Sequence, residues 1–306
     1  MTAIPTGTER TRHWVPDGPH DVAGALRPLR RGPHDPAFRE DADGLWLAAN
    51  TPAGVGALRL RIAGEVHASA WGPGADLLLD GLPALLGALD DDSGFVAHHP
   101  LVAEVRRRRP GMRLGATGRV WDVLLAAIIE QKVTGAEAHR TWRDLARRFG
   151  ERPPGPAPEG LFTPPTPRAV LGIEDWEWHK AGLDGARRRA VLAAAQVAGR
   201  LERAAELRGA AGRELLRKAP GIGVWTAAEV AQRAWGDPDA LSVGDYHLSN
   251  LIGHALLGRR IDDERMLAEL AVYEPQRHRA ALYVLAAGLG KPRFAPRFSP
   301  RDYRAF

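Results

Sequence analysis

The stretch Leu215–Leu256, LLRKAPGIGVWTAAEVAQRAWGDPDALSVGDYHLSNLIGHAL, decides how the rest of the chain is interpreted. Gly221 and Gly223 lie one residue apart after Pro220, between two runs of residues with helical spacing. Because proline ends a helix and glycine tolerates positive φ, the segment predicts a tight hairpin between two helices. The second helix would begin near Val224 with unpaired N–H groups and the positive end of its dipole facing outward, which suits a phosphate. An ordinary corner between two helices explains the same residues without any ligand.

Asp245 follows the hairpin by about twenty residues, directly after Gly244, where a further helix is predicted to begin. Aspartate is a favoured N-cap, so capping alone explains this residue. A hairpin followed at this distance by a capping aspartate is nevertheless more specific than either feature. The intervening Asp237 and Asp239 fall in a loop and are expected to be solvated.

Composition limits the classes of protein that remain. The 306 residues suffice for two or three domains, and a hydrophobic fraction of 44% is typical of a packed core. The absence of cysteine excludes disulfides, thiolate-ligated iron–sulfur clusters and Cys-ligated zinc. The net charge of +5 favours a polyanionic partner only mildly, because an arginine bias can also arise from genome base composition. Without a long apolar run or a secretory signal, we expect a cytoplasmic bacterial protein with access to nucleoid DNA.

The N-terminal third has strand periodicity. Residues 1–43 contain few apolar residues, and we expect their start to be loosely ordered. Residues 58–62 alternate apolar and basic side chains, and 66–70 continue the alternation after a turn at Ala63-Gly64. Residues 44–50 predict a further strand and 74–91 a helix, so a small antiparallel sheet with a covering helix is expected within about 15–95.

From about Pro100 the apolar spacing is helical. A proline-rich loop at 151–167 interrupts the pattern, and the tail 291–306 is basic and has too many prolines for a helix. Besides the helices that flank the hairpin, the predicted helices cover 100–109, 118–133, 135–150, 185–207 and 275–290.

The hairpin sequence APGIGVWTA (219–227), followed by Asp245, resembles the helix-hairpin-helix (HhH-GPD) DNA glycosylase superfamily. It is most similar to the 3-methyladenine DNA glycosylase II branch, whose hairpin is close to LPGIGPWTA. Arg109–Ala138 resembles the segment that opens the family's helical domain, and residues 183–195 resemble the long helix before the hairpin. The similarity covers about 45–290 and is weaker before Pro100.

This resemblance implies an α+β fold that is mainly α. Residues 1–105 would form an α+β domain like the TATA-binding protein, and 106–290 the helical glycosylase core, with an active-site cleft between two subdomains. Residues 291–306 would form a basic tail.

The implied activity is that of a base excision repair enzyme that removes alkylated purines such as 3-methyladenine. The base would leave the helical stack, and the carboxylate of Asp245 would stabilise the oxocarbenium-like sugar and orient the attacking water. Bifunctional relatives carry a Schiff-base lysine where this chain has Trp225, so we expect a monofunctional enzyme without lyase activity.

The resemblance also implies a base pocket and a DNA-contact surface. Trp225 would stack on the extruded base. Glu229, where the branch can carry an aromatic, could pair with a base edge or with an arginine, or could be ordinary surface. Core packing explains each aromatic as well, and for Tyr273 the two interpretations weigh equally. The pocket residues implied are Trp225, Tyr246, Tyr273 and Glu229. The DNA contacts implied are Gln131 and Lys132, which would fill the gap left by the base, with Lys218, Gly221, Gly223, Thr226 and His247.

The implied partner is double-stranded DNA that contains damaged bases, bound by a monomer without membrane contact. No cofactor and no metal are expected, although the resemblance is compatible with a monovalent cation at the hairpin backbone. Three alternatives remain: a glycosylase for other damaged bases, an inactive helix-hairpin-helix DNA-binding protein, and a helical metal hydrolase. The eleven histidines suggest the last, but their scattered positions lack a ligand pattern such as HExxH.

Overall fold

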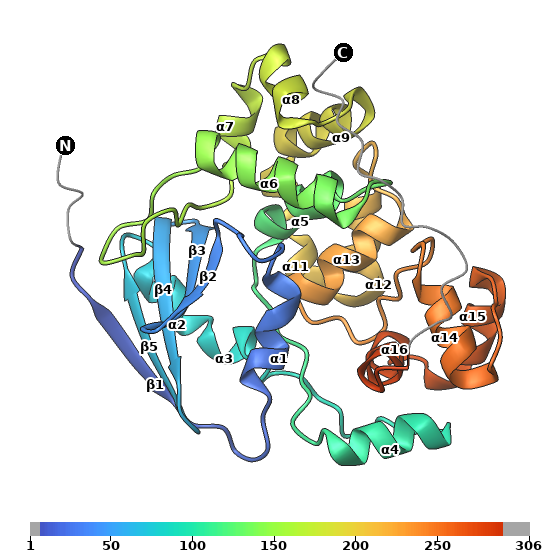
Figure 1. The fold of residues 1–306 in the computed structure, drawn as a ribbon. Coiled ribbons are helices and arrows are strands. Elements are labelled where there is room, and N and C mark those ends of the chain that lie inside the picture. Colours follow the sequence, from blue (N-terminus) through green and yellow to red (C-terminus); the bar gives the residue numbers. More distant parts are fainter. Residues whose placement is uncertain (1–6, 290–306) are drawn as a thin grey trace.

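The computed structural model describes residues 7–289 and combines a small sheet with a larger set of helices. The fold is therefore α+β and mainly α, as the sequence predicts. Figure 1 shows the sheet at one side of the molecule, and the helices of residues 100–286 above and beside it. Within residues 7–289, none of the helices is long and apolar enough to cross a bilayer. The expectations for the first six residues and for the tail 291–306 lie outside the described residues.

The sheet has five antiparallel strands in the order β1-β5-β4-β3-β2. The strands are β1 Arg10–Trp14, β2 Phe38–Asp41, β3 Gly44–Thr51, β4 Gly54–Ile62 and β5 Val66–Trp71. The three strands predicted from the sequence are β3, β4 and β5. The two edge strands, β1 and β2, were not predicted, because each is short and carries few apolar residues.

Short helices cover one face of the sheet. They are α1 Val22–Leu26, η1 Arg27–Leu29, α2 Ala75–Asp80 and α3 Leu82–Leu85. The register pairs Leu47 with Leu58 and Leu58 with Ala70, so these apolar side chains share the face on which the helices pack. The helix predicted at 74–91 is in fact the two short helices α2 and α3.

The opposite face of the sheet packs against the proline-rich segment. Trp46 and Trp71 stack at 5.4 Å between ring centroids, and Leu161 joins them in a small buried cluster. The guanidinium of Arg59 lies over both indoles. The loop predicted at 151–167 therefore covers the sheet while it connects two helices.

The remaining helices form two cores. Their bounds are α4 Pro100–Arg108, α5 Val120–Ile129, α6 Gly135–Phe149, α7 Pro167–Leu171, α8 Asp175–Ala181, α9 Gly185–Gln196, α10 Ala198–Leu201, α11 Ala204–Leu207, α12 Gly209–Arg217, α13 Val224–Ala234, α14 Leu248–Leu257, α15 Asp263–Leu270, η2 Ala271–Tyr273 and α16 Arg277–Ala286. The single helix predicted at 185–207 is wrong: Val197 leaves helical geometry, so the segment becomes α9, α10 and α11.

Helix α5 organises the larger core. All but one of its residues are buried, and it lies against α9 and α13. Its sequence VWDVLLAAII is apolar on almost every side, as is typical of a helix enclosed by others. The smaller core joins α4 with α14, α15 and α16. Helix α13 belongs to the larger core and α14 to the smaller one, so the segment 235–247 connects the two cores.

Candidate active site

The hairpin predicted at Pro220–Gly223 connects α12 to α13. Ile222 is buried and anchors the turn in the larger core. Gly221 has φ +84°, and a Cβ added there would lie 2.5 Å from Cβ of Ala190 on α9. Gly221 is therefore required by backbone conformation and by close packing. Lys218 is exposed at the C-terminal end of α12.

The N-terminus of α13 is open to solvent. Gly223, its N-cap, is exposed, and no side chain caps the first turn. A Cβ added to Gly223 would meet nothing within 4 Å. The first N–H groups of α13 are thus available to an external anion, with the positive end of the helix dipole behind them.

Gln131 joins the end of α5 to this hairpin. Its side-chain amide donates to the carbonyl oxygen of Gly221 at 3.0 Å and to the hydroxyl of Thr226 at 2.8 Å. Thr226 is buried, so its hydroxyl supports the hairpin from inside. Lys132, the next residue after Gln131, is exposed and has φ +54°, an uncommon conformation for a residue with a side chain. The two residues expected to enter DNA therefore lie directly beside the hairpin.

The two oxygens of the Asp245 carboxylate have different hydrogen-bond partners. Its Oδ1 accepts from the backbone N–H groups of His247 at 2.7 Å and Leu248 at 2.9 Å, so it caps the start of α14. Its Oδ2 accepts from the indole N–H of Trp225 at 3.3 Å. Capping holds the carboxylate in one orientation, and the second oxygen lies beside the aromatic residue that follows the hairpin.

Further aromatic surface surrounds this carboxylate. Tyr246 is 71% exposed, and its ring meets the ring of His247 edge-on at 4.8 Å between centroids. Trp225 is partly exposed. A large aromatic side chain exposed next to a fixed carboxylate is a platform for a planar group.

Glu229 is held in a network with Arg233 and Ser242. Its Oε2 lies 2.8 Å from Nη1 of Arg233, and the hydroxyl of Ser242 donates to its Oε1 at 2.6 Å. Although burial alone would raise the pKa of Glu229, the Arg233 guanidinium and the Ser242 hydrogen bond hold it below the usual range. Of the alternatives for Glu229, the structure shows pairing with an arginine, within a largely buried network.

Tyr273 is buried in the smaller core. It is 5% exposed, stacks on Phe95 at 5.7 Å, and its hydroxyl accepts from the backbone N–H of His99 at 2.9 Å. Burial raises the pKa of this phenol. The interpretation as core packing therefore holds, and the placement of Tyr273 in the base pocket is corrected.

The expectation that Asp237 and Asp239 are solvated is wrong. Asp237 is buried, where it pairs with Arg213 and accepts from the indole N–H of Trp235. Asp239 accepts from Nε of Arg277 at 2.8 Å. These carboxylates fix the loop between α13 and α14, whereas Asp245 accepts from Trp225 in the first turn of α13.

Comparison with solved structures identifies the fold. A 3-methyladenine DNA glycosylase from Archaeoglobus fulgidus matches with a TM-score of 0.72 and 16% identity over 90% of this chain and 97% of that one. MBOgg1 in complex with a low-affinity DNA ligand matches with a TM-score of 0.70 and 16% identity, over 92% and 96% of the two chains. The apo-form of an 8-oxoguanine glycosylase/lyase from Clostridium acetobutylicum matches with a TM-score of 0.70 and 12% identity, over 93% and 99%.

No protein-family model matches the sequence, and no curated protein matches it. At 12–16% identity, the structural likeness shows the fold alone. The chain has the fold of the helix-hairpin-helix DNA glycosylases, with a mainly helical core and an N-terminal antiparallel sheet.

Proposed function

We propose that this protein is a monofunctional DNA glycosylase of base excision repair that removes alkylated purines such as 3-methyladenine. The observation that carries the proposal is the pairing of Asp245 with Trp225. One oxygen of the carboxylate is fixed by backbone N–H groups at the start of α14. The other accepts from the indole of Trp225, which lies two residues after Gly223 of the hairpin. A glycosylase fold supplies the setting in which these groups would face DNA.

The open N-terminus of α13 is the proposed grip on the DNA backbone. A phosphate bound by the N–H groups beyond Gly223 would hold the strand without contacting its bases. The damaged nucleotide would then be extruded, since its glycosidic bond is buried within the duplex. Gln131 and Lys132, beside the hairpin, are the residues proposed to occupy the gap.

Asp245 is the proposed catalytic residue. As the glycosidic bond breaks, positive charge develops on the sugar, and a fixed carboxylate stabilises that charge more than it stabilises the neutral ground state. The capping bonds to Oδ1 leave Oδ2 as the oxygen nearer Trp225. This oxygen is proposed to orient the attacking water and to accept its proton.

The choice of alkylated purines depends on the aromatic residues around Asp245. An N-alkylated purine carries positive charge, which the faces of Trp225 and Tyr246 attract. Such a base is also a good leaving group, so its release does not require a strong general acid. The matched structures include both a 3-methyladenine glycosylase and an 8-oxoguanine glycosylase/lyase, and the aromatic residues favour the first chemistry for this chain.

Hydrolysis without strand cleavage is proposed because Trp225 occupies the position at which bifunctional relatives carry their lysine. A lyase step needs an amine that attacks the sugar carbon to form a Schiff base. An indole cannot do this.

The test is base release from a panel of duplexes, each with one lesion: 3-methyladenine, hypoxanthine, 8-oxoguanine or a mismatch. We expect abasic sites from alkylated DNA, without nicks until alkali is added. Asp245→Asn should lower the rate by on the order of 100-fold or more while duplex binding persists. Asp262→Asn is the matched control, because Asp262 also caps a helix, through the N–H of Arg265.

Each outcome has a distinct meaning. Equal activity of Asp245→Asn and Asp262→Asn would overturn the catalytic assignment. Strand cleavage without alkali would contradict the monofunctional mechanism, and Lys132→Met and Lys218→Met would then identify the amine. Binding without any base release would favour the inactive DNA-binding alternative.

A further inference from the structure

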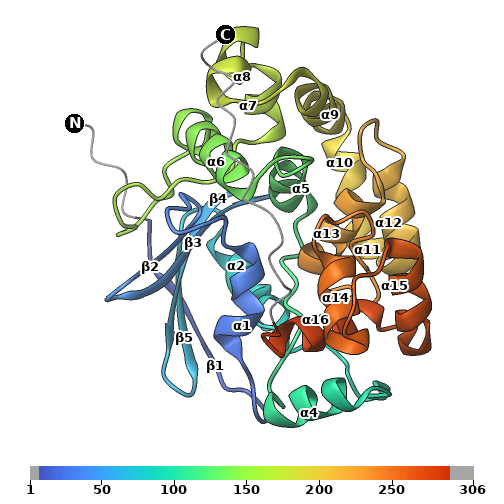
Figure 2. The ribbon, with the colours of Figure 1, turned by 45° about the vertical axis from the view of Figure 1, so that its right-hand side comes forward.

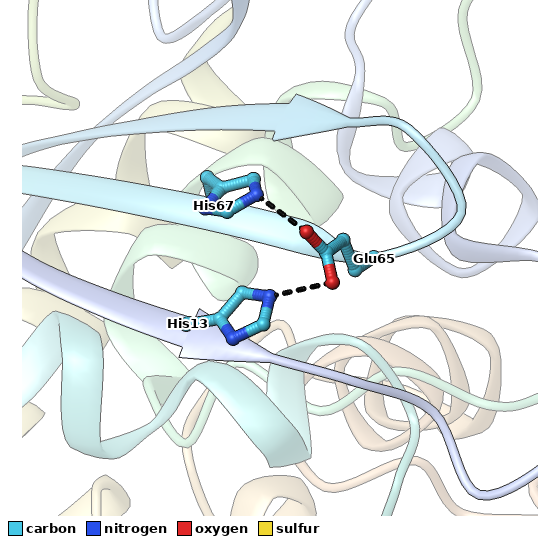
Figure 3. Close-up of side chains that lie close together, drawn as sticks. All are labelled: His13, Glu65 and His67. Atoms are coloured by element: carbon cyan, nitrogen blue, oxygen red, sulfur yellow. Dashed lines mark hydrogen bonds and ion pairs between the residues drawn. The ribbon is translucent and has the colours of Figure 1, made fainter.

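Two histidines and a glutamate meet at the free edge of the sheet. His13 lies on the edge strand β1, His67 lies on β5, and Glu65 directly precedes β5. Figure 3 shows both imidazoles directed at the same carboxylate: Nε2 of His13 is 2.9 Å from Oε2 of Glu65, and Nε2 of His67 is 2.8 Å from Oε1. One candidate ligand atom from each residue lies within 4.8 Å of the other two.

Strand geometry explains the meeting of these side chains. His13 and His67 are directly opposite each other in the antiparallel register, so they project from the same face of the sheet. Their rings stack with 4.6 Å between centroids and 20° between planes. Glu65 precedes His67 by two residues, and the period of a strand therefore places it on that face as well.

We propose that His13, Glu65 and His67 bind a divalent transition metal ion, with Zn²⁺ as the best fit. Two imidazole nitrogens and one carboxylate are a ligand set that Zn²⁺ accepts, with solvent in the fourth position. Zinc ligands at about 2.1 Å in a tetrahedron lie roughly 3.4 Å apart. The imidazole–carboxylate separations are already shorter than this, and the exposed side chains can rotate to bring the two nitrogens together.

The surrounding charges are compatible with a cation. Arg61 is opposite His67 on the neighbouring strand β4, but its Nε donates to the backbone carbonyl of Asp43. The nearest cross-strand guanidinium is thus held by another partner.

The ion would act as a clamp between β1 and β5. The edge strand β1 pairs on only one side, with β5, and a shared metal would tie it to the sheet through side chains as well as through the backbone. Figures 1 and 2 show β1 separated from α12 and α13, which carry the hairpin, so the proposed metal site is distinct from the proposed glycosylase site. No metal was expected from the sequence, in which β1, the strand that carries His13, was not predicted.

The experiment titrates Zn²⁺ into tag-free protein at pH 7.5, by calorimetry and by competition with a chromophoric chelator. We expect one tight equivalent. Glu65→Gln and the double variant His13→Gln/His67→Gln should each weaken it at least about tenfold, since each removes a ligand. His34→Gln is the matched control, because His34 is an exposed histidine outside the cluster.

A second measurement tests the clamp directly. Zn²⁺ should slow amide hydrogen exchange in Arg10–Trp14 of the natural chain and leave exchange in the double variant unchanged. The proposal is overturned if the natural chain and the variants bind Zn²⁺ with the same affinity, or if the natural chain does not bind Zn²⁺. The cluster would then be only an ion-paired set of surface residues.

Discussion

Two glycines in one turn are predicted to serve different purposes, and one substitution applied at both positions separates them. Gly221 has φ +84°, and an added Cβ would lie 2.5 Å from Cβ and 3.2 Å from Cα of Ala190. Gly223 has φ −89°, which any residue adopts, and open space beside its Cα. Alanine at 221 therefore disturbs the fold, whereas alanine at 223 adds a methyl group only to the surface proposed to meet a phosphate.

The expected magnitudes differ accordingly. For Gly221→Ala, the left-handed conformation costs about 1–2 kcal/mol, and forcing a methyl against α9 costs about 1–3 kcal/mol. The free energy of unfolding should therefore fall by about 2–5 kcal/mol. For Gly223→Ala, the same quantity should stay constant or rise by about 0.4–1 kcal/mol, because the unfolded chain loses freedom. If the methyl displaces one charge-assisted hydrogen bond to a phosphate, worth about 1.5–3 kcal/mol, duplex binding weakens by roughly 10- to 100-fold.

Urea unfolding followed by circular dichroism measures the first effect, and fluorescence anisotropy of a labelled duplex at fixed ionic strength measures the second. If Gly221→Ala has the same free energy of unfolding as the natural chain, close packing of Gly221 against Ala190 would be refuted. Unchanged duplex affinity of Gly223→Ala, together with unchanged stability, would refute the proposal that the hairpin grips a phosphate.

Three further substitutions test the surroundings of the site. Glu229→Gln should lower the free energy of unfolding by about 3 kcal/mol at pH 7, because it leaves Arg233 buried without a countercharge. Folding lowers the pKa of Glu229, so the stabilisation from its carboxylate is present above pH 4.5 and is lost as the pH falls through the folded pKa. Thermal unfolding should therefore show a smaller difference in stability between the natural chain and the variant at pH 3 than at pH 7. A difference that stays constant would contradict the ion pair. Tyr273→Phe should lower the free energy of unfolding by about 1 kcal/mol through its lost hydrogen bond to His99, and should leave base release intact. Slow base release by a stable variant would instead indicate that Tyr273 contacts the base. Gln131→Ala should weaken duplex binding in the anisotropy assay by loosening the hairpin, and full affinity would show that its two hydrogen bonds are dispensable.

Much of the fold follows from periodicity. The strands β4 and β5 were predicted from the alternation of their side chains, and β3 was predicted from its run of apolar residues. Strand β1, RTRHW, lacks that signal, since it forms an edge and is held mainly by backbone pairing with β5. The break at Val197 was also missed, because residues on both sides of it keep helical spacing.

Some features of the site follow from residues close together in the sequence, and others depend on contacts between distant segments. The approach of Trp225 to Asp245 agrees with the resemblance, although only the structure supplies the hydrogen bond between them. Glu229 and Arg233 are four residues apart on one helix, so their spacing was a usable signal for an ion pair. Tyr273 depends on Phe95, far away in the sequence, and no local pattern predicts such a contact.

The hairpin and the carboxylate are joined through one helix end, and this has a mechanical consequence. Trp225 is the second residue of α13, whose N-cap is Gly223, and its indole bonds directly to Asp245. The distance from a phosphate bound at the hairpin to the carboxylate would therefore be set by a few covalent bonds and by this one hydrogen bond, which links α13 of the larger core to the start of α14 in the smaller core. A DNA backbone held at Gly223 is, on this reasoning, already in register with Asp245, so lesion selection must depend on which nucleotide can leave the stack and rest against the aromatic residues.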